Sequence, residues 1–126
     1  MHFSLAPVIL ATLASTVFAA DTQVKVGSNS ILSFDPPSVN ASAGDTVTFI
    51  FYPKNHTVTQ STFAAPCQQM DGGANSGFQP VTANATNVPS FSITVNNTTP
   101  LWFYCMQAKY AVTFLIPHMN LQADRL

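Results

Sequence analysis

The sequence of 126 residues carries very little charge. It has four Lys and Arg together and five Asp and Glu, with no Glu among them, so the formal net charge is −1. No basic patch is present, and binding to nucleic acid therefore lacks an electrostatic basis. There are also no paired carboxylates and no Gly-x-Ser-x-Gly nucleophile motif, and we predict a protein that is not an enzyme.

Helical periodicity is missing as well. No segment repeats apolar residues at the spacing of 3.6 over three turns, and short β-branched and aromatic runs alternate with Gly-, Pro- and Asn-rich turns. The main expected strands are 22–27, 31–34, 46–52, 55–60, 91–95, 101–104 and 110–116. In 55–60, His56, Val58 and Gln60 should share one face. These seven or eight short strands predict an all-β fold, a Greek-key antiparallel β-sandwich.

The first twenty residues form an apolar segment without Lys, Arg, Asp or Glu, and it ends in Ala19 and Ala20. This pattern is typical of a secretory signal peptide over 1–20, cleaved near one of these two alanines. A transmembrane anchor is the alternative, but polar residues and a proline interrupt the apolar run. We therefore expect a secreted, extracellular protein.

The segment after the leader is long enough for a single domain, which we place at 21–119. Residues 120–126 form a short C-terminal tail without a hydrophobic anchor signal, and no membrane attachment is expected once the leader is removed. Sugar is expected to compensate for the low charge. Five Asn-x-Ser/Thr sequons predict a glycoprotein, at Asn40, Asn55, Asn84, Asn96 and Asn97.

Two apolar strands each end near a residue that binds soft metals. His56 follows the strand 46–52, and Cys105 follows the aromatic run 102–104, which we expect to lie in the core. A histidine and a cysteine at strand ends are half of a blue-copper site, which uses two His, one Cys and a weak axial ligand. His56 as a purely structural residue is the alternative.

At these positions the chain resembles the secreted fungal cupredoxins, relatives of the plant phytocyanins that are also described as extracellular serine-rich proteins. The motifs that carry the resemblance are 44–49 (GDTVTF), 52–61 (YPKNHTVTQS), 66–67 (PC), 77–78 (GF) and 102–107 (WFYCMQ). The resemblance implies a Greek-key β-sandwich that holds a type 1 copper and passes electrons. It also implies His56 as the first imidazole ligand and Cys105 as the thiolate.

The chain departs from the family pattern after Cys105. In the family a His-Cys pair and then Gly-Met follow, and the His and Met complete the copper site; this block is absent here. Met106 and Gln107 are weak candidate ligands. His118 and Met119 have suitable side chains, but the strand 110–116 spans about 23 Å and carries them away from Cys105, so we do not expect them at the site. The predicted copper site is therefore incomplete.

The two cysteines have a competing interpretation. In an oxidising compartment Cys67 and Cys105 could form a disulfide, which would abolish the thiolate ligand. The resemblance implies that Cys67 pairs with the second cysteine of the missing block.

The sequence thus leaves two functions open. The first is a secreted cupredoxin-like glycoprotein of copper-binding and electron-transfer lineage with an incomplete copper site. The second is a β-sandwich without metal that acts as a cell-wall or surface interaction module. We expect a monomer whose partner is a redox protein or a cell-wall component, and uptake of copper separates the two hypotheses.

Overall fold

The computed structural model describes residues 2–12, 18–107 and 111–114. The described elements are β1 (Asp21–Val26), the 3-10 turn η1 (Ser28–Ser30), β2 (Phe34–Asp35), β3 (Thr46–Phe51), β4 (Asn55–His56), β5 (Thr59–Ser61), β6 (Gln79–Pro80), β7 (Ser90–Thr94), β8 (Leu101–Tyr104) and β9 (Ala111–Phe114). The regular secondary structure of the described residues therefore consists of short strands and one 3-10 turn. It contains no helix that is long and apolar enough to span a bilayer.

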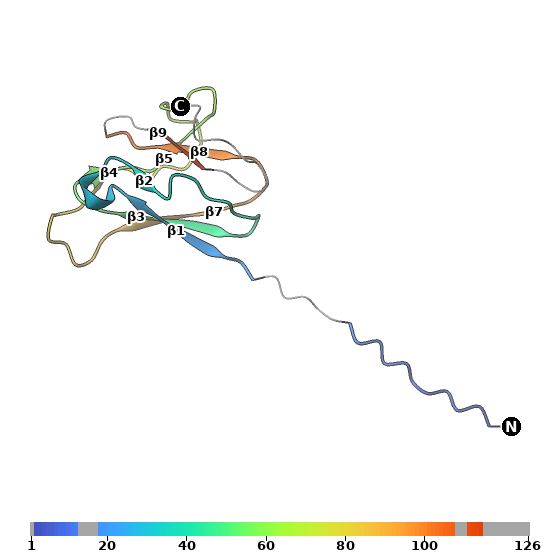
Figure 1. Ribbon diagram of the computed structural model, residues 1–126. Helices are drawn as coiled ribbons and strands as arrows, with labels where there is room; N and C mark the ends of the chain where they lie inside the picture. Colours follow the sequence, from blue (N-terminus) through green and yellow to red (C-terminus); the bar gives the residue numbers. More distant parts are fainter. Residues whose placement is uncertain (1, 13–17, 108–110, 115–126) are drawn as a thin grey trace.

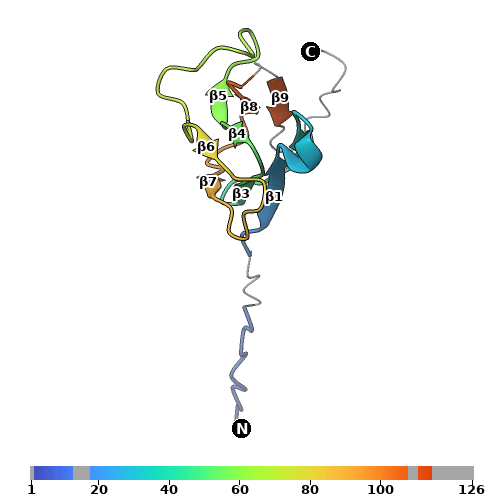
Figure 2. The same cartoon turned by 90° about the vertical axis from the view of Figure 1, so that its left-hand side faces the viewer.

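The strands form two layers (Figures 1 and 2). One sheet has the order β2-β1-β3-β7, the other has the order β5-β8-β9, and β4 pairs with β6 beside them. The chain changes layer between β3 and β5, between β5 and β7, and again between β7 and β8. The predicted all-β sandwich with Greek-key crossovers is confirmed.

One pairing differs from the prediction of a wholly antiparallel sandwich. β1 and β3 run parallel, with Asp21 opposite Thr46 and Val26 opposite Phe51, so the first sheet is mixed. A parallel pair needs a long crossover, and residues 27–45 supply one through η1 and β2. The antiparallel prediction was wrong here because strand patterning does not reveal the direction of the neighbouring strand.

The core follows from the alternation along β1 and β3. Val47, Phe49 and Phe51 point inward from β3 and are buried, while the residues between them are partly exposed. The Phe49 ring meets Phe34 edge-on at a centroid distance of 6.0 Å. It also meets Phe103 of β8 at 5.5 Å, which joins the two sheets.

The segment 55–60 is not the single alternating strand that the sequence predicts. It is divided into β4, which pairs with β6, and β5, which pairs with β8. All side chains from His56 to Thr59 are buried. Alternation fails because this segment passes between two pairing partners and is covered on both sides.

Two other expected strands are shorter than predicted. In 31–34 only Phe34 is in a strand, and Ile31 and Leu32 are 59% and 49% exposed. The last strand is described over Ala111–Phe114, and the remainder of 110–116 lies outside the described residues. In the aromatic run, Phe103 and Tyr104 are buried as expected, but Trp102 is only partly buried and packs against Phe63.

We predict that Phe49→Ala lowers the free energy of unfolding by about 3–5 kcal/mol, because it removes a buried ring and leaves a cavity between the two sheets. Chemical denaturation of the purified protein measures this change. Phe78 is 49% exposed, so the control Phe78→Ala should change stability by less than about 0.5 kcal/mol. Equal losses in the two variants would contradict the assignment of Phe49 to the core.

Candidate metal centre

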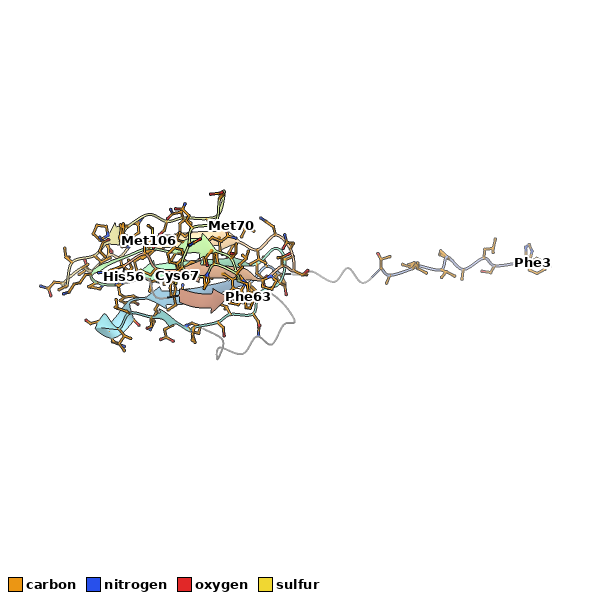
Figure 3. The ribbon with its side chains drawn as sticks, turned by 90° about the horizontal axis from the view of Figure 1, so that it is seen from above. Phe3, His56, Phe63, Cys67, Met70 and Met106 are labelled. Atoms are coloured by element: carbon orange, nitrogen blue, oxygen red, sulfur yellow. The ribbon has the colours of Figure 1, made fainter. Side chains whose placement is uncertain are left out.

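The pairing of β5 with β8 brings the two predicted ligands together. Thr59 lies opposite Tyr104 in this antiparallel register. The residues before Thr59 therefore lie beside the residues that follow Tyr104, and His56 and Thr57 meet Cys105. Figure 3 shows His56 and Met106 at the end of the sandwich remote from the N-terminal segment.

The geometry of this pair fits a shared metal ion. His56 Nδ1 lies 3.9 Å from Cys105 Sγ, and the two residues are 3% and 0% exposed. Bonds of about 2.0 Å to nitrogen and about 2.3 Å to sulfur, at a trigonal angle of about 120°, separate such atoms by about 3.8 Å. One imidazole and one sulfur are thus already at the spacing of two ligands on a first-row transition metal.

Thr57 holds the cysteine in position from the histidine side. Its backbone N–H donates to Cys105 Sγ at 3.3 Å, and its Oγ1 accepts the N–H of Met106 at 2.9 Å. Hydrogen bonds to sulfur stabilise a thiolate and tune a metal bound to it. Thr57 was not among the predicted site residues, because its position in the motif 52–61 and in the sequon of Asn55 gives no sign of a contact with Cys105.

Gly27 packs directly against the imidazole of His56. A Cβ placed on Gly27 would collide with Nε2 and would lie 2.6 Å from Cε1 and 2.7 Å from Cδ2. Gly27 also has φ +73°, a conformation that favours glycine. Its missing side chain therefore lets the ring turn Nδ1 toward Cys105. Sequence reasoning missed this residue because it lies at the far end of β1.

A hollow of about 300 Å³ opens beside His56. Its lining consists of Ser30, Leu32, Pro53, Lys54, His56 and Gln107. The Oε1 atom of Gln107 is buried and has no hydrogen-bond partner in the described structure. Met106 is 42% exposed. Of the two weak candidate ligands, Gln107 is therefore the better placed, and glutamine is a known axial ligand of copper.

The described residues do not complete a type 1 site. Among them no group of three or more His, Cys, Asp or Glu side chains is close enough to share a metal ion. β9 pairs with β8 so that Ala111 faces Tyr104 and Phe114 faces Leu101, which means that it runs away from Cys105. His118 and Met119, which follow it, lie outside the described residues.

The structure contains no disulfide between Cys67 and Cys105. Burial raises the pKa of the Tyr104 hydroxyl above its ordinary value, and the nearby Cys67 raises it further. Cys67 thus lies near Tyr104, whereas Cys105 Sγ contacts His56 and Thr57. Tyr104 and Cys105 are neighbours at the end of a strand, and their side chains point to opposite sides. The sulfur atoms of Cys67 and Cys105 are therefore separated.

The architecture is similar to that of the cupredoxins. The chain superposes on a purple cupredoxin from Nitrosopumilus maritimus with a TM-score of 0.58 and 14% identity. The match covers 76% of this chain and 99% of that protein. At this level of identity the comparison establishes the fold alone.

Two fungal proteins from Arthroderma benhamiae are similar in sequence. One is named probable GPI-anchored cupredoxin-1, is 29% identical over 108 residues, and matches 86% of this chain and 55% of its own length. The other is named extracellular serine-rich protein, is 32% identical over 105 residues, and matches 82% of this chain and 40% of its own length. The chain therefore spans about half of the length of these relatives.

No protein-family model matches the sequence. The resemblance to the secreted fungal cupredoxins is nevertheless confirmed by these two relatives, and the predicted cupredoxin-like fold is confirmed by the solved structure. The chain has a cupredoxin-like fold. What it binds is a separate question.

We predict that Gly27→Ala displaces the His56 ring, because the new methyl group would occupy its place. The expected loss of stability is about 2–5 kcal/mol, the sum of overpacking and an unfavourable backbone conformation. Denaturation and the NMR signals of the His56 ring report the change.

Gly72 provides a matched control, since its φ is +71° and a Cβ there would meet no atom within 4 Å. Gly72→Ala should lose only the stability that the unfavourable backbone conformation costs, about 1–2 kcal/mol. If Gly27→Ala cost no more than Gly72→Ala and left the His56 signals in place, Gly27 would have no part in positioning the ring.

Proposed function

We propose that this protein is a secreted, non-enzymatic copper-binding cupredoxin-like glycoprotein, which retains Cu(I) through Cys105 Sγ and His56 Nδ1. The observation that carries this proposal is that these two atoms are buried and lie 3.9 Å apart. Buried polar atoms at such a spacing, with Thr57 N–H aimed at the sulfur, form half of a metal site before any metal enters.

The donor set favours Cu(I) over Cu(II). Thiolate is a soft ligand that selects Cu(I), whereas a blue-copper site needs a second imidazole to hold both oxidation states. Gln107 Oε1 would add a weak third donor from the wall of the same hollow. Copper bound by this set would stay reduced, so the proposed role is retention of the metal, and electron transfer would require a further ligand.

The names of the relatives agree with a position outside the cell. One is named as GPI-anchored and as a cupredoxin, and the other as extracellular. We extend to this chain only the extracellular location and the copper lineage, in line with its apolar leader and its sequons. No enzymatic role is proposed.

A second function remains in competition, that of a metal-free surface interaction module. The sequons favour it, because the side chains of Asn40, Asn84, Asn96 and Asn97 are all exposed. Sugars at these positions would cover part of the sandwich surface. In this alternative the polar, glycosylated surface would bind a cell-wall component.

Copper titration distinguishes the two functions. We expect the folded protein under reducing conditions to bind one equivalent of Cu(I) in competition with a chromophoric chelator. Cys105→Ser should weaken binding at least about tenfold, because it removes the soft ligand. Cys67→Ser should bind as the wild type does. Cu(II) should produce no intense thiolate-to-copper band.

Other outcomes have definite meanings. If the folded wild type fails to compete for Cu(I), the proposal is wrong and the surface module is favoured. An intense Cu(II) band would mean that a second imidazole completes a type 1 site, and His118→Ala would then test whether His118 supplies it. A matching loss in Cys67→Ser would move the site away from Cys105.

The glycan pattern gives a separate prediction. Asn55 is partly buried in β4, its Oδ1 is buried without a hydrogen-bond partner in the described structure, and the next residue is His56. A glycan here would have to be attached to a side-chain amide that is partly buried in the folded protein. We expect Asn55 to be unoccupied in the folded, secreted protein.

Glycopeptide mass spectrometry measures occupancy, with Asn40 and Asn84 as exposed positive controls and at most one of Asn96 and Asn97 occupied, because their sequons overlap. Asn55→Gln should leave the glycosylated mass unchanged apart from the substitution itself. Full occupancy of Asn55 would show that the β4 edge opens, and would argue against a closed metal site there.

A further inference from the structure

The backbone of Ala20 is tied at both ends to the start of β3. Its N–H donates to Asp45 Oδ1 at 2.9 Å, and its carbonyl oxygen accepts the N–H of Thr46 at 2.9 Å. These two bonds fix Ala20 as an extension of β1 along β3. Ala20 thus belongs to the sandwich, although it lies within the predicted leader 1–20.

Asp45 is itself held in place by the turn that carries it. Its Oδ2 accepts the N–H of Ser42 at 2.8 Å, and its backbone N–H donates to the Ser42 carbonyl at 2.9 Å. Its carbonyl oxygen accepts the N–H of Val95 at 2.8 Å. The carboxylate therefore faces the Ala20 nitrogen in a defined geometry.

Among the described residues 2–12, 18 and 19, the large apolar side chains are exposed. Leu5 is 94% exposed, Leu10 is 81% exposed and Phe18 is 85% exposed. Figure 3 shows Phe3 far from the sandwich. Apolar side chains left in water in this way are a liability in a mature protein. The boundary between the leader and the folded domain therefore falls just before Ala20.

The sequence around this boundary favours one bond over its neighbour. Signal peptidases require small residues at the last and third-last positions of the leader. Cleavage after Ala19 places Ala19 and Val17 there, whereas cleavage after Ala20 places the large Phe18 at the third-last position. Cleavage after Ala20 would also remove both hydrogen bonds that Ala20 makes to the sandwich.

We propose that the chain is processed between Ala19 and Ala20, and that the new α-ammonium group of Ala20 forms an ion pair with Asp45. The secretory peptidase adds water across this peptide bond. The hydroxyl goes to the Ala19 carbonyl carbon, which becomes a carboxylate, and the Ala20 nitrogen takes up protons to become the ammonium group. Processing thus converts an amide hydrogen bond into a charged one at the same nitrogen.

The charged groups around this pair set its dependence on pH. The N–H groups of Ala20 and Ser42 hold the pKa of Asp45 below its ordinary value. Asp21, the next residue, accepts the hydroxyls of Thr46 and Thr48, and this lowers its pKa too. Both carboxylates therefore stay ionised beside the ammonium group at neutral pH.

The Asp45 carboxylate and the Ala20 ammonium group contribute to stability over different ranges of pH. A carboxylate with a lowered pKa stabilises the fold above its unfolded value of 3.8, and this stability is lost as the pH falls through the folded pKa. An ammonium group paired with Asp45 has a raised pKa. Its contribution is complete below the unfolded value of about 8 and is lost as the pH rises through the folded pKa.

The first test is the N-terminus of the secreted protein. The full precursor is expressed in a secreting eukaryotic host, and the N-terminus is sequenced from the medium. We expect Ala20 as the first residue. A start at Asp21, or a protein that retains its leader, would overturn the proposed site.

The second test is the pKa of the Ala20 α-amino group, followed by NMR through the Ala20 methyl signal. We expect a value above the typical value of about 8 in the wild type and a return to it in Asp45→Asn. Asp71 is exposed, so Asp71→Asn is the control and should leave the value unchanged. An identical pKa in wild type and Asp45→Asn would overturn the ion pair.

The thermal midpoints of the wild type and of Asp45→Asn, measured over a range of pH, distinguish loss of the ion pair from weakening of the turn that carries Asp45. Asp45→Asn also weakens the bond to the Ser42 N–H, but that amide does not titrate. The difference in thermal midpoint between the wild type and Asp45→Asn should therefore decrease as the pH rises from about 7 to about 10, where the ammonium group loses its proton. This proposal rests on the secretion part of the proposed function, and Cu(I) binding is independent of the outcome.

Discussion

The antiparallel pairing of β5 with β8 is the constraint on which the candidate site depends. With Thr59 fixed opposite Tyr104, the residues that precede Thr59 must meet the residues that follow Tyr104, and Thr57 donates its N–H to Cys105 Sγ. A slip of one residue would turn Cys105 to the other side of the strand. The spacing of histidine and cysteine is therefore a property of strand register, which the core residue Phe103 helps to fix through Phe49.

The same end of the sandwich shows why a fold can be retained while its chemistry changes. Cupredoxin architecture requires the two layers and their apolar contacts, and these are intact here. The resemblance to the secreted fungal cupredoxins implies that the remaining type 1 ligands follow the cysteine, and in this chain β9 already begins at Ala111. The core contacts of the described strands do not depend on such ligands, so the sheets can pair whether or not a metal site is complete.

His56 is positioned by neighbours from three parts of the chain. Gly27 at the end of β1 leaves room for the ring, Thr57 links the histidine segment to the cysteine loop, and Gln107 shares the adjacent hollow. A buried imidazole with a fixed ring plane can present only one nitrogen to a metal. Such supporting contacts decide how well a ligand pair holds its ion.

The sequence by itself determined the all-β class, most strand positions, and the choice of His56 and Cys105. Alternation along a strand and the chemistry of ligand side chains are local properties, readable from neighbouring residues. Only the tertiary structure decided the parallel pairing of β1 with β3, the division of 55–60 between two partners, and the roles of Gly27 and Thr57. These features depend on contacts between residues distant in sequence, and no local pattern specifies which backbone will lie against which side chain.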